Sequence, residues 1–312
     1  MHRPPRSLLF PSCFYSGTET HPVYVDHLAA QANCGRELPV VMLHGAFHTG
    51  VAYLATPDGR PGWASFFSQR GHDVYVPDWP GHGRSPARVP LAQVSTREAA
   101  ASLAVLIAAV GPAIVLAHSA AGPMAWWIAE NHPESVAAVI GIAPGPPANL
   151  QQPLPADPEA VGALRFDSQA GCPVYSSLER AREVGCAFIQ DFWANSPRFP
   201  KDSIGAYSKS IVPESSRILN ERFNIGGAGL RLKSPALVAD RPILIVTGDC
   251  DPRHPQAVDQ RLATFLGADF LWLPDAGVIG NGHMLMIEEN SDEIATLISR
   301  WMQRRHLSST KA

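Results

Sequence analysis

Short apolar runs alternate with helix-like stretches along most of this chain of 312 residues. The runs are continuously apolar, which is typical of strands that are buried on both faces. They are Val40–Leu43, Val74–Val76, Ile114–Leu116, Val136–Ile142, Ile243–Val246 and Phe270–Leu273, and the helix-like stretches are Thr96–Val110, Met124–Asn131, Ala257–Leu266 and Ser291–Arg304. This alternation predicts an α/β fold with a doubly wound, mostly parallel sheet. At the start of the chain, Pro22–Leu28 follows a turn at Gly17 and is expected to add antiparallel strands at an edge.

The regular spacing breaks after the run that ends at Ile142. A proline-rich connector follows, and then come helix-like pieces at Leu178–Trp193 and Asp202–Ser210. The pattern of strands and helices resumes at Ile243. We therefore predict an α/β core formed by residues 1–143 and 241–312, with a helical cap inserted at residues 144–240.

The charge balance excludes several classes of partner. The 25 lysines and arginines are outnumbered by 28 acidic residues, so no basic surface for nucleic acid or an anionic membrane is indicated. The apolar stretch near the start is too short for a secretory signal, and no run reaches the roughly 18 apolar residues of a membrane span. The five cysteines are odd in number and form no CxxC pair. The sequence predicts reduced thiols and a cytoplasmic location, with no nucleic-acid or membrane partner.

Polar side chains directly follow several of the predicted strands. His44, Asp78 and Ser119 come just after three of the runs, Asp251 follows a later one, and His283 lies in the loop after the last. In an open parallel sheet, ligands bind outside the carboxyl ends of the strands. We therefore expect a serine, carboxylates and a histidine to meet at one edge of the sheet.

Ser119 is the candidate nucleophile. The segment 114–122 is predicted to form a strand, a tight turn and a helix, with Ser119 at the apex. This is the context of a nucleophile elbow, in which a sharp turn lifts the serine Oγ clear of the sheet. Small residues are needed two positions before and two after the serine, and here Ala117 and Ala121 replace the usual glycines. The alternative is that Ser119 only caps the helix that follows it.

Two backbone N–H groups are candidates for holding the oxyanion of an acyl-transfer reaction. Ala120 follows the candidate nucleophile at the start of a helix, where N–H groups are free to bind an anion. Gly45 permits a tight turn that would leave the N–H of Ala46 pointing at the substrate. We expect His44 to orient this loop through its ring. His44 and His48 have the spacing of a metal pair, but the glycine between them disfavours a helix, so we predict no metal site.

His283 is the candidate general base, because a histidine after the last strand can reach back over the sheet edge to Ser119. His254 is the other histidine considered for this role. The acid that orients the base is expected in the loop at 247–254. Asp251 lies deeper in this loop than Asp249, and we favour it, with Asp249 as the alternative.

The chain resembles the α/β-hydrolase fold superfamily in the ordered motifs LHGAF, DWPGHGRS, AHSAAG, TGDCDP and GNGHM, over residues 23–306. The order Ser119, Asp251, His283 along the chain is also that of this superfamily. The resemblance implies the fold and a hydrolytic activity, whereas the substrate does not carry over.

More narrowly, the TPDGRPGW and GNGHM segments resemble a bacterial esterase subfamily. That subfamily has two adjacent cysteines where this chain has Ala46 and Phe47, and a glutamate acid where this chain has Ala143. Its insertion also precedes the nucleophile, whereas here it follows the Val136–Ile142 strand. The comparison implies that the acid lies at Asp251, the commoner location in the superfamily.

These features predict a serine hydrolase that cleaves a carboxylic ester or lactone of a small, hydrophobic substrate without a metal or organic cofactor. The alternative uses the same residues for non-hydrolytic, C–C bond-cleaving or cyclising chemistry on a polyketide-like or aromatic substrate. A third hypothesis is a receptor or scaffold that binds a ligand without turnover. The candidate substrate contacts are Phe47, Phe192 and Trp193. A small-molecule substrate is the only partner indicated, and no oligomeric state is predicted.

Overall fold

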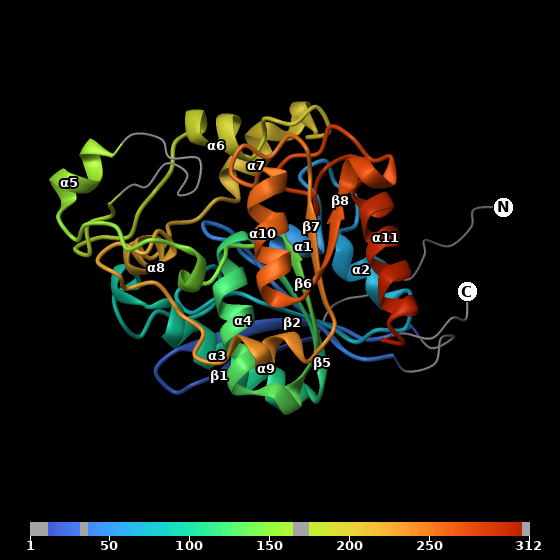
Figure 1. The fold of residues 1–312 in the computed structure, drawn as a ribbon. Helices are drawn as coiled ribbons and strands as arrows, with labels where there is room; N and C mark the ends of the chain where they lie inside the picture. Colours follow the sequence, from blue (N-terminus) through green and yellow to red (C-terminus); the bar gives the residue numbers. More distant parts are fainter. Residues whose placement is uncertain (1–11, 32–36, 165–174, 308–312) are drawn as a thin grey trace.

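The computed structural model describes residues 12–31, 37–164 and 175–307. Within these ranges the strands form an eight-stranded sheet in the order β1-β2-β4-β3-β5-β6-β7-β8 (Figure 1). The strands are β1 (Ser12–Gly17), β2 (Pro22–Leu28), β3 (Val40–Leu43), β4 (Val74–Pro77), β5 (Ala113–His118), β6 (Val136–Ile142), β7 (Ile243–Thr247) and β8 (Asp269–Trp272). β2 pairs antiparallel with both β1 and β4, and the other pairs are parallel. The predicted doubly wound, mostly parallel sheet with an antiparallel edge is confirmed.

The central strands end together at one edge of the sheet. Leu43 of β3 lies opposite Ala117 of β5, and Ile142 of β6 lies opposite both His118 of β5 and Val246 of β7. Every residue of β3, β5 and β7 is buried, as their continuously apolar sequences require. The residues that follow these strands therefore meet at the same edge.

Helices cover both faces of the sheet (Figure 1). Helices α3, α4, α9 and α10 pack beside one another on one face, and α1, α2 and α11 form the layer on the other. The bounds are α1 (Val51–Leu54), α2 (Trp63–Ser68), α3 (Thr96–Val110), α4 (Gly122–Asn131), α5 (Pro158–Ala163), α6 (Cys186–Phe192), α7 (Ile204–Lys209), α8 (Ser216–Arg222), α9 (Pro235–Ala239), α10 (Gln256–Leu266) and α11 (Ser291–Arg304).

Local chemistry defines the ends of α3, the longest helix. Ser95 caps its first turn, because the Ser95 hydroxyl accepts a hydrogen bond from the N–H of Glu98 and the Glu98 carboxylate accepts one from the N–H of Ser95. The last helical residue is Val110, and the C-cap Gly111 has a φ of 88° that side-chain-bearing residues rarely adopt. Both boundaries agree with the predicted range Thr96–Val110.

The segment between β6 and β7, residues 144–240, is here called the insertion. It carries helices α5 to α9, and Figure 1 shows α6 and α7 on the side toward which the arrow of β8 points. Backbone hydrogen bonds join distant parts of the insertion, pairing Leu154 with Asn224 and Gly226, and Arg182 with Glu214. Helix α9 packs against α4 and α10, so this part of the predicted cap range belongs to the helical layer of the core.

The predicted helix at Leu178–Trp193 is wrong over its first half. A helix is present only at Cys186–Phe192, beginning after Gly185. The residues before it form a turn and irregular backbone with one isolated bridge, in which the N–H and C=O of Arg182 both bond to the backbone of Glu214 at 2.9 Å. Such pairing depends on a partner far along the chain, and a local apolar pattern gives no indication of it.

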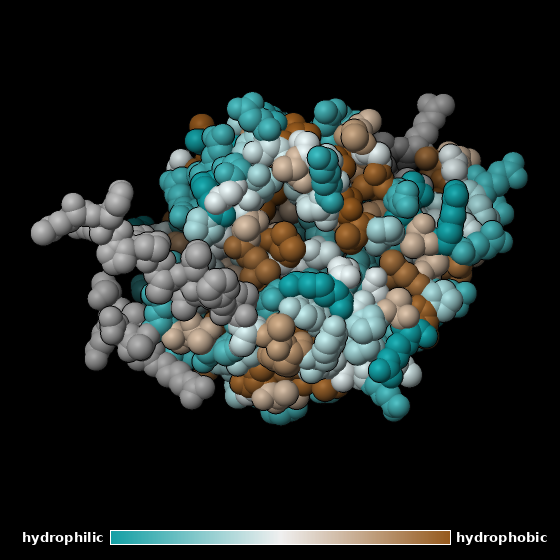
Figure 2. Space-filling view, turned by 180° about the vertical axis from the view of Figure 1, so that it is seen from behind, coloured by the Kyte–Doolittle hydropathy of each residue, from teal (hydrophilic) through white to brown (hydrophobic). Residues whose placement is uncertain are grey.

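The surface seen in Figure 2 carries hydrophobic residues as separate patches among hydrophilic ones. Scattered apolar residues of this kind are normal on a folded chain. None of the helices in the described ranges is long and apolar enough to cross a membrane.

Candidate active site

Ser119 sits at a sharp turn between β5 and α4. Its φ of 52° is in the left-handed region, which costs free energy for a residue with a side chain and is found mostly where function requires it. Strand β5 ends at His118, a single helical turn covers Ser119–Ala121, and α4 begins at Gly122. This is the strand–turn–helix arrangement predicted from the sequence.

Close backbone packing holds this turn from behind. The carbonyl of Ser119 accepts a hydrogen bond of 2.8 Å from the N–H of Gly145. Gly122 lies so near the same loop that a Cβ added to it would be 2.4 Å from the carbonyl oxygen of Gly145. The flanking Ala117 and Ala121 are fully buried, which explains why only small residues fit on either side of the serine.

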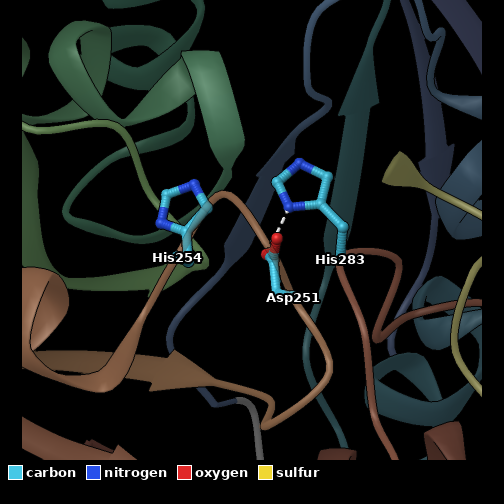
Figure 3. A group of neighbouring side chains, drawn as sticks. All are labelled: Asp251, His254 and His283. Atoms are coloured by element: carbon cyan, nitrogen blue, oxygen red, sulfur yellow. Dashed lines mark hydrogen bonds and ion pairs between the residues drawn. The ribbon is translucent and has the colours of Figure 1, made fainter. Parts of the chain in front are cut away.

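A chain of hydrogen bonds joins Ser119, His283 and Asp251. The Oγ of Ser119 lies 3.0 Å from Nε2 of His283. Nδ1 of the same ring lies 2.6 Å from Oδ2 of Asp251, the contact drawn as a dashed line in Figure 3. The exposed fractions of the three residues are 7%, 2% and 5%. The structure thus brings together the serine, histidine and carboxylate that the sequence singled out from three separate loops.

The surroundings set opposite charge preferences for the acid and the base. Burial alone would raise the pKa of the Asp251 carboxyl, but the neighbouring His283 and His254 hold it well below its usual range. Burial lowers the pKa of His283, with His254 and Arg253 acting in the same direction and Asp251 opposing them. A carboxylate beside a neutral imidazole is the state in which a histidine can take a proton from a serine.

Asp249, the alternative acid, does not touch His283. Its Oδ1 accepts hydrogen bonds from the N–H groups of Gly280 and Asn281, at 2.8 and 3.1 Å. Asp249 therefore braces the loop that carries His283, while Asp251 contacts the ring itself.

His254 stacks on the base without reaching the serine. Its ring lies 5.4 Å from that of His283, at 24° to it, and its Nδ1 contacts Oδ1 of Asp259 at 3.1 Å. Asp251, His254 and His283 are the group of described side chains that could converge on one metal ion, with ligand atoms within 4.8 Å of one another (Figure 3). An ion there would compete with the hydrogen bond between His283 and Asp251.

Glu288 fixes the His283 loop and was not assigned a role from the sequence. Its buried carboxylate accepts hydrogen bonds from the Gly282 N–H at 2.8 Å, from the Asn281 amide at 2.6 Å and from the Ser196 hydroxyl at 2.5 Å. Ser196 belongs to the insertion, so this network ties the insertion to the loop. Burial raises the pKa of Glu288. Gly282 and Asn281 are six and seven positions away, whereas Ser196 is 92 positions away, so the contact with the insertion has no local signal in the sequence.

The loop after β3 approaches the serine closely. A Cβ on Gly45 would lie 2.5 Å from Nδ1 of the buried His118 and 3.1 Å from the Cβ of Ser119, so a side chain here would require its neighbours to shift. The ring of His44 accepts the N–H of Trp79 at Nε2, 3.0 Å away, and therefore donates from Nδ1 to the carbonyl of Gly45 at 2.8 Å. Burial lowers the pKa of His44 to about 3, which keeps this ring neutral.

These contacts orient the N–H of Ala46. In the trans peptide between Gly45 and Ala46, the N–H points away from the carbonyl that His44 holds. Ala46 lines the cavity above Ser119. Ala120, the other predicted donor, follows Ser119 in the first helical turn, where N–H groups have no partner within the helix.

The next peptide is held by the insertion. Phe47 has a φ of 65°, and its N–H donates to Oε2 of Glu214 at 2.9 Å while its carbonyl accepts the N–H of Val212 at 3.0 Å. Oε1 of Glu214 contacts Nε2 of His82 at 3.0 Å, and both side chains are fully buried. On the other side, the carbonyl of Ala46 contacts Nδ1 of His48 at 2.7 Å. Sequence reasoning missed Glu214.

A cavity of about 210 Å³ leads to Ser119 and His283. Phe47, Phe192 and Trp193, the predicted substrate contacts, all line it. The rings of Phe47 and Trp193 pack together with centroids 5.6 Å apart. The remaining lining combines apolar, histidine, serine and arginine side chains, namely Ala46, His48, His118, Ser176, Arg182, Val184, Phe188, Leu219, Arg222, Phe223 and Arg253.

The sequence of the chain matches that of a known family. A sequence profile described as the alpha/beta hydrolase family matches residues 40–297, which is most of the chain. The chain belongs to the alpha/beta hydrolase family. The predicted superfamily is thereby confirmed.

Individual relatives of this hydrolase differ widely in sequence. It is 24% identical to a protein named probable secreted lipase phiG, from Fungal sp. (strain ATCC 74256), over 94% of this chain and 90% of that protein. A thermophilic esterase from Thermogutta terrifontis has a similar structure, with a TM-score of 0.63 at 18% identity over 95% of this chain and 99% of that chain. The N-acyl homoserine lactonase AidH gives a TM-score of 0.62 at 16% identity, over 97% and 99%. At such identities the two structures support the fold alone.

Proposed function

We propose that this alpha/beta hydrolase cleaves a carboxylic ester or lactone through a catalytic triad of Ser119, His283 and Asp251. The observation that carries the proposal is the unbroken chain of hydrogen bonds from Ser119 to Asp251, with the serine on a strained turn at the base of a cavity. Ser119 attacks the carbonyl carbon, and His283 takes its proton and later returns it to the leaving group.

Asp251 holds the imidazole in the tautomer whose Nε2 faces the serine, and stabilises the imidazolium that forms during attack. The N–H groups of Ala46 and Ala120 are proposed to bind the oxyanion of the tetrahedral intermediate. Such donors stabilise the transition state most when they are fixed in advance. The contacts of His44 and Glu214 on either side of Ala46 supply this rigidity. The mechanism requires no metal or organic cofactor.

The substrate is proposed to be small and largely hydrophobic, bound under the insertion, which acts as a cap. Aromatic side chains including Phe47, Phe192 and Trp193 line the cavity. A relative named as a lipase supports ester chemistry.

Labelling with a fluorophosphonate probe, mapped by mass spectrometry, tests the triad. We expect covalent labelling at Ser119, with loss of labelling in Ser119→Ala and weaker labelling in Asp251→Asn. On an ester and lactone panel, Ser119→Ala should lower kcat by roughly a thousandfold or more. The matched control is Ser135→Ala, since Ser135 is also 7% exposed but lies beyond the far end of α4. A folded protein that neither labels nor loses activity on Ser119→Ala contradicts the proposal.

The aromatic cavity also favours a second candidate, non-hydrolytic or C–C bond-cleaving chemistry on a polyketide-like or aromatic substrate. Elimination and cyclisation differ from ester hydrolysis in the source of the product oxygen, whereas C–C bond hydrolysis differs in releasing a carbon-bonded fragment instead of an alcohol. Hydrolysis in oxygen-labelled water places one labelled oxygen in the acid product, whereas elimination or cyclisation incorporates none.

We propose a cytoplasmic location on the basis of the cysteines. Cys13, Cys186 and Cys250, the cysteines that the structure describes, are free, as is usual for a protein kept in a reducing compartment. The name of the fungal relative points to secretion of that protein. Recovery of this hydrolase in the culture medium of its source cells would overturn the proposal.

A further inference from the structure

The charged side chains that line the cavity are all of one sign. Arg182, Arg222 and Arg253 contribute to its wall, and no aspartate or glutamate is among the lining residues in the part of the chain that the structure describes. The other contributors are mostly aromatic or aliphatic. A cavity with a positive wall and an apolar body selects a ligand that combines an anionic group with a hydrophobic portion.

Among the described residues, Arg222 is the cation in this wall whose guanidinium has no hydrogen-bonding or ionic partner. Arg222 is the last residue of α8, and its guanidinium lies over the ring of Phe223 at 5.0 Å. By contrast, the guanidinium of Arg84 binds both Asp26 and Asp78. The side chain is partly buried and faces the cavity.

Leaving such a group unpaired is costly. Burial, together with the nearby charge of Arg253, lowers the pKa of Arg222 to about 9, so the group is still a cation at neutral pH. A partly buried cation with unused donors loses hydration without gaining hydrogen bonds in return. A ligand anion would supply those hydrogen bonds together with an opposite charge.

The neighbouring arginines are held in place by the protein. Arg253 lies 5.7 Å from the ring centroid of Phe188 and 5.4 Å from that of Phe192. The guanidinium of Arg182 donates to the carbonyl of Tyr175 at 3.4 Å, and the backbone of Arg182 pairs with that of Glu214. Arg182 and Arg253 add positive potential to the cavity, whereas the guanidinium N–H groups of Arg222 are available to bind a ligand.

We propose that Arg222 is a substrate-binding residue for a carboxylate, and that the substrate is an ester or lactone bearing a carboxylate at the end of an apolar chain. The planar guanidinium matches a planar carboxylate in two parallel hydrogen bonds. A monoanion also loses less hydration than a phosphate dianion on entering a largely apolar cavity. This inference rests on the proposed hydrolase function and names its substrate class.

A matched pair of substrates tests the inference. The para-nitrophenyl esters of glutarate and glutaramate have acyl chains of the same shape, and only the first ends in a carboxylate. We expect the full-length protein to prefer the glutarate ester by roughly tenfold or more in kcat/KM. Arg222→Met should abolish this preference, and Arg222→Lys should keep part of it. The control is Arg217→Met, on the same helix but outside this cavity, which should leave the preference intact.

The preference separates substrate binding from an indirect effect, because Arg222 also lies close enough to Asp251 to influence its charge. If Arg222→Met lowers turnover of both esters by the same factor, the residue acts through Asp251 and the inference is overturned. Equal turnover of the two esters by the wild-type protein overturns it as well.

A binding experiment keeps the inference separate from the hydrolase proposal. Calorimetry with Ser119→Ala compares phenylbutyrate with phenylbutanamide, neither of which can be hydrolysed at an ester. We expect roughly tenfold tighter binding of the carboxylate, lost in Ser119→Ala/Arg222→Met. If Ser119 is not labelled by fluorophosphonate but this preference persists, the triad proposal fails and the anion site stands. Equal affinities overturn the anion site whatever the labelling result.

Discussion

The backbone N–H of Phe47 donates a 2.9 Å hydrogen bond to the carboxylate of Glu214, which lies 167 positions later in the chain. Phe47 adopts a φ of 65°, a conformation that is costly without external support. Glu214 and Val212 supply that support by binding both polar groups of the Phe47 backbone. Because Ala46 directly precedes Phe47, a side chain of the insertion fixes the loop that carries a proposed oxyanion donor.

Glu214→Gln should lower kcat while leaving KM nearly unchanged. The variant keeps the size of the side chain but cannot accept hydrogen bonds from the N–H groups of Phe47 and Ser215 and from His82 all together. A less rigid Ala46 N–H weakens binding of the transition state alone, with an expected loss of about tenfold in kcat. Steady-state kinetics on a neutral ester measure both constants.

Glu221→Gln is the control for this variant. Glu221 is also a carboxylate of the insertion that accepts a backbone N–H, that of Thr96 at 2.7 Å, but it lies away from the Ala46 loop. We expect kcat to stay within about twofold of the wild-type value, since surface changes away from such a loop have small effects. An equal loss in both variants would mean that Glu214 acts through general stability.

The buried pair of His82 and Glu214 predicts a pH-dependent stability. Burial would lower the pKa of His82, but the charge of Glu214 and its hydrogen bond raise it above the usual 6.5. Burial would raise the pKa of Glu214, but His82 holds it below the usual 4.5. The histidine contributes stability below its unfolded pKa and loses it as pH rises through the raised value. The glutamate contributes above its unfolded pKa and loses stability as pH falls through the lowered value.

The difference in unfolding free energy between wild type and Glu214→Gln should therefore be largest between about pH 4.5 and 6.5 and shrink on both sides. Removing one partner of a fully buried pair costs about 3 kcal/mol in this window. Chemical denaturation at several pH values measures it. A difference that does not vary with pH would show that the two groups are not paired as ions.

The pH–rate profile should have its acid limb below pH 6.5. The base must be neutral to accept the proton of Ser119, and burial lowers the pKa of His283 from the usual 6.5. His254 contributes to this lowering, so His254→Gln should move the acid limb to higher pH. The logarithm of kcat/KM against pH gives both midpoints. A midpoint that moves to lower pH in His254→Gln would contradict the assigned electrostatics.

Gly122→Ala should destabilise the elbow. The added Cβ would lie 2.4 Å from the carbonyl oxygen of Gly145 and 2.8 Å from its nitrogen, so backbone must move. We expect a loss of about 1–3 kcal/mol in unfolding free energy and a lower kcat, because Gly145 also holds the carbonyl of Ser119. Gly162→Ala in α5 is the control, since nothing lies within 4 Å of its added Cβ. Similar melting temperatures for the two variants would contradict the packing argument.

The core of the fold could be predicted because local sequence determines it. Val136–Ile142 and Thr96–Val110 have the predicted bounds, since buried strands are continuously apolar and α3 has its own cap. The insertion could not be predicted so well. Its first half depends on pairing such as that of Arg182 with Glu214, whereas the missed helix α8 does carry a local signal, the N-cap at Ser215.

The same division holds for the site. Ser119, His283 and Asp251 could be found because each directly follows a strand or lies in a loop at the same edge of the sheet. Glu214 and Glu288 could not be found from their local sequence, since Glu214 binds a backbone N–H 167 positions away and Glu288 ties its own loop to Ser196, 92 positions away. The sequence restricts both the residue type and the position of candidate catalytic groups. A residue that positions a loop needs only a side chain that can reach the backbone of that loop.

The insertion leaves the core at the end of β6 and returns at the start of β7, and these two strands are neighbours in the sheet. We therefore expect that this segment can be exchanged without altering the register of any strand. Such an exchange should change the selectivity of the enzyme. The exchange is constrained, because this segment also carries helix α9 of the core layer, Ser196, which binds Glu288, and Glu214. A chimaera that receives a foreign insertion must receive a replacement acceptor for the Phe47 N–H, or it will acquire a new pocket above a disabled catalyst.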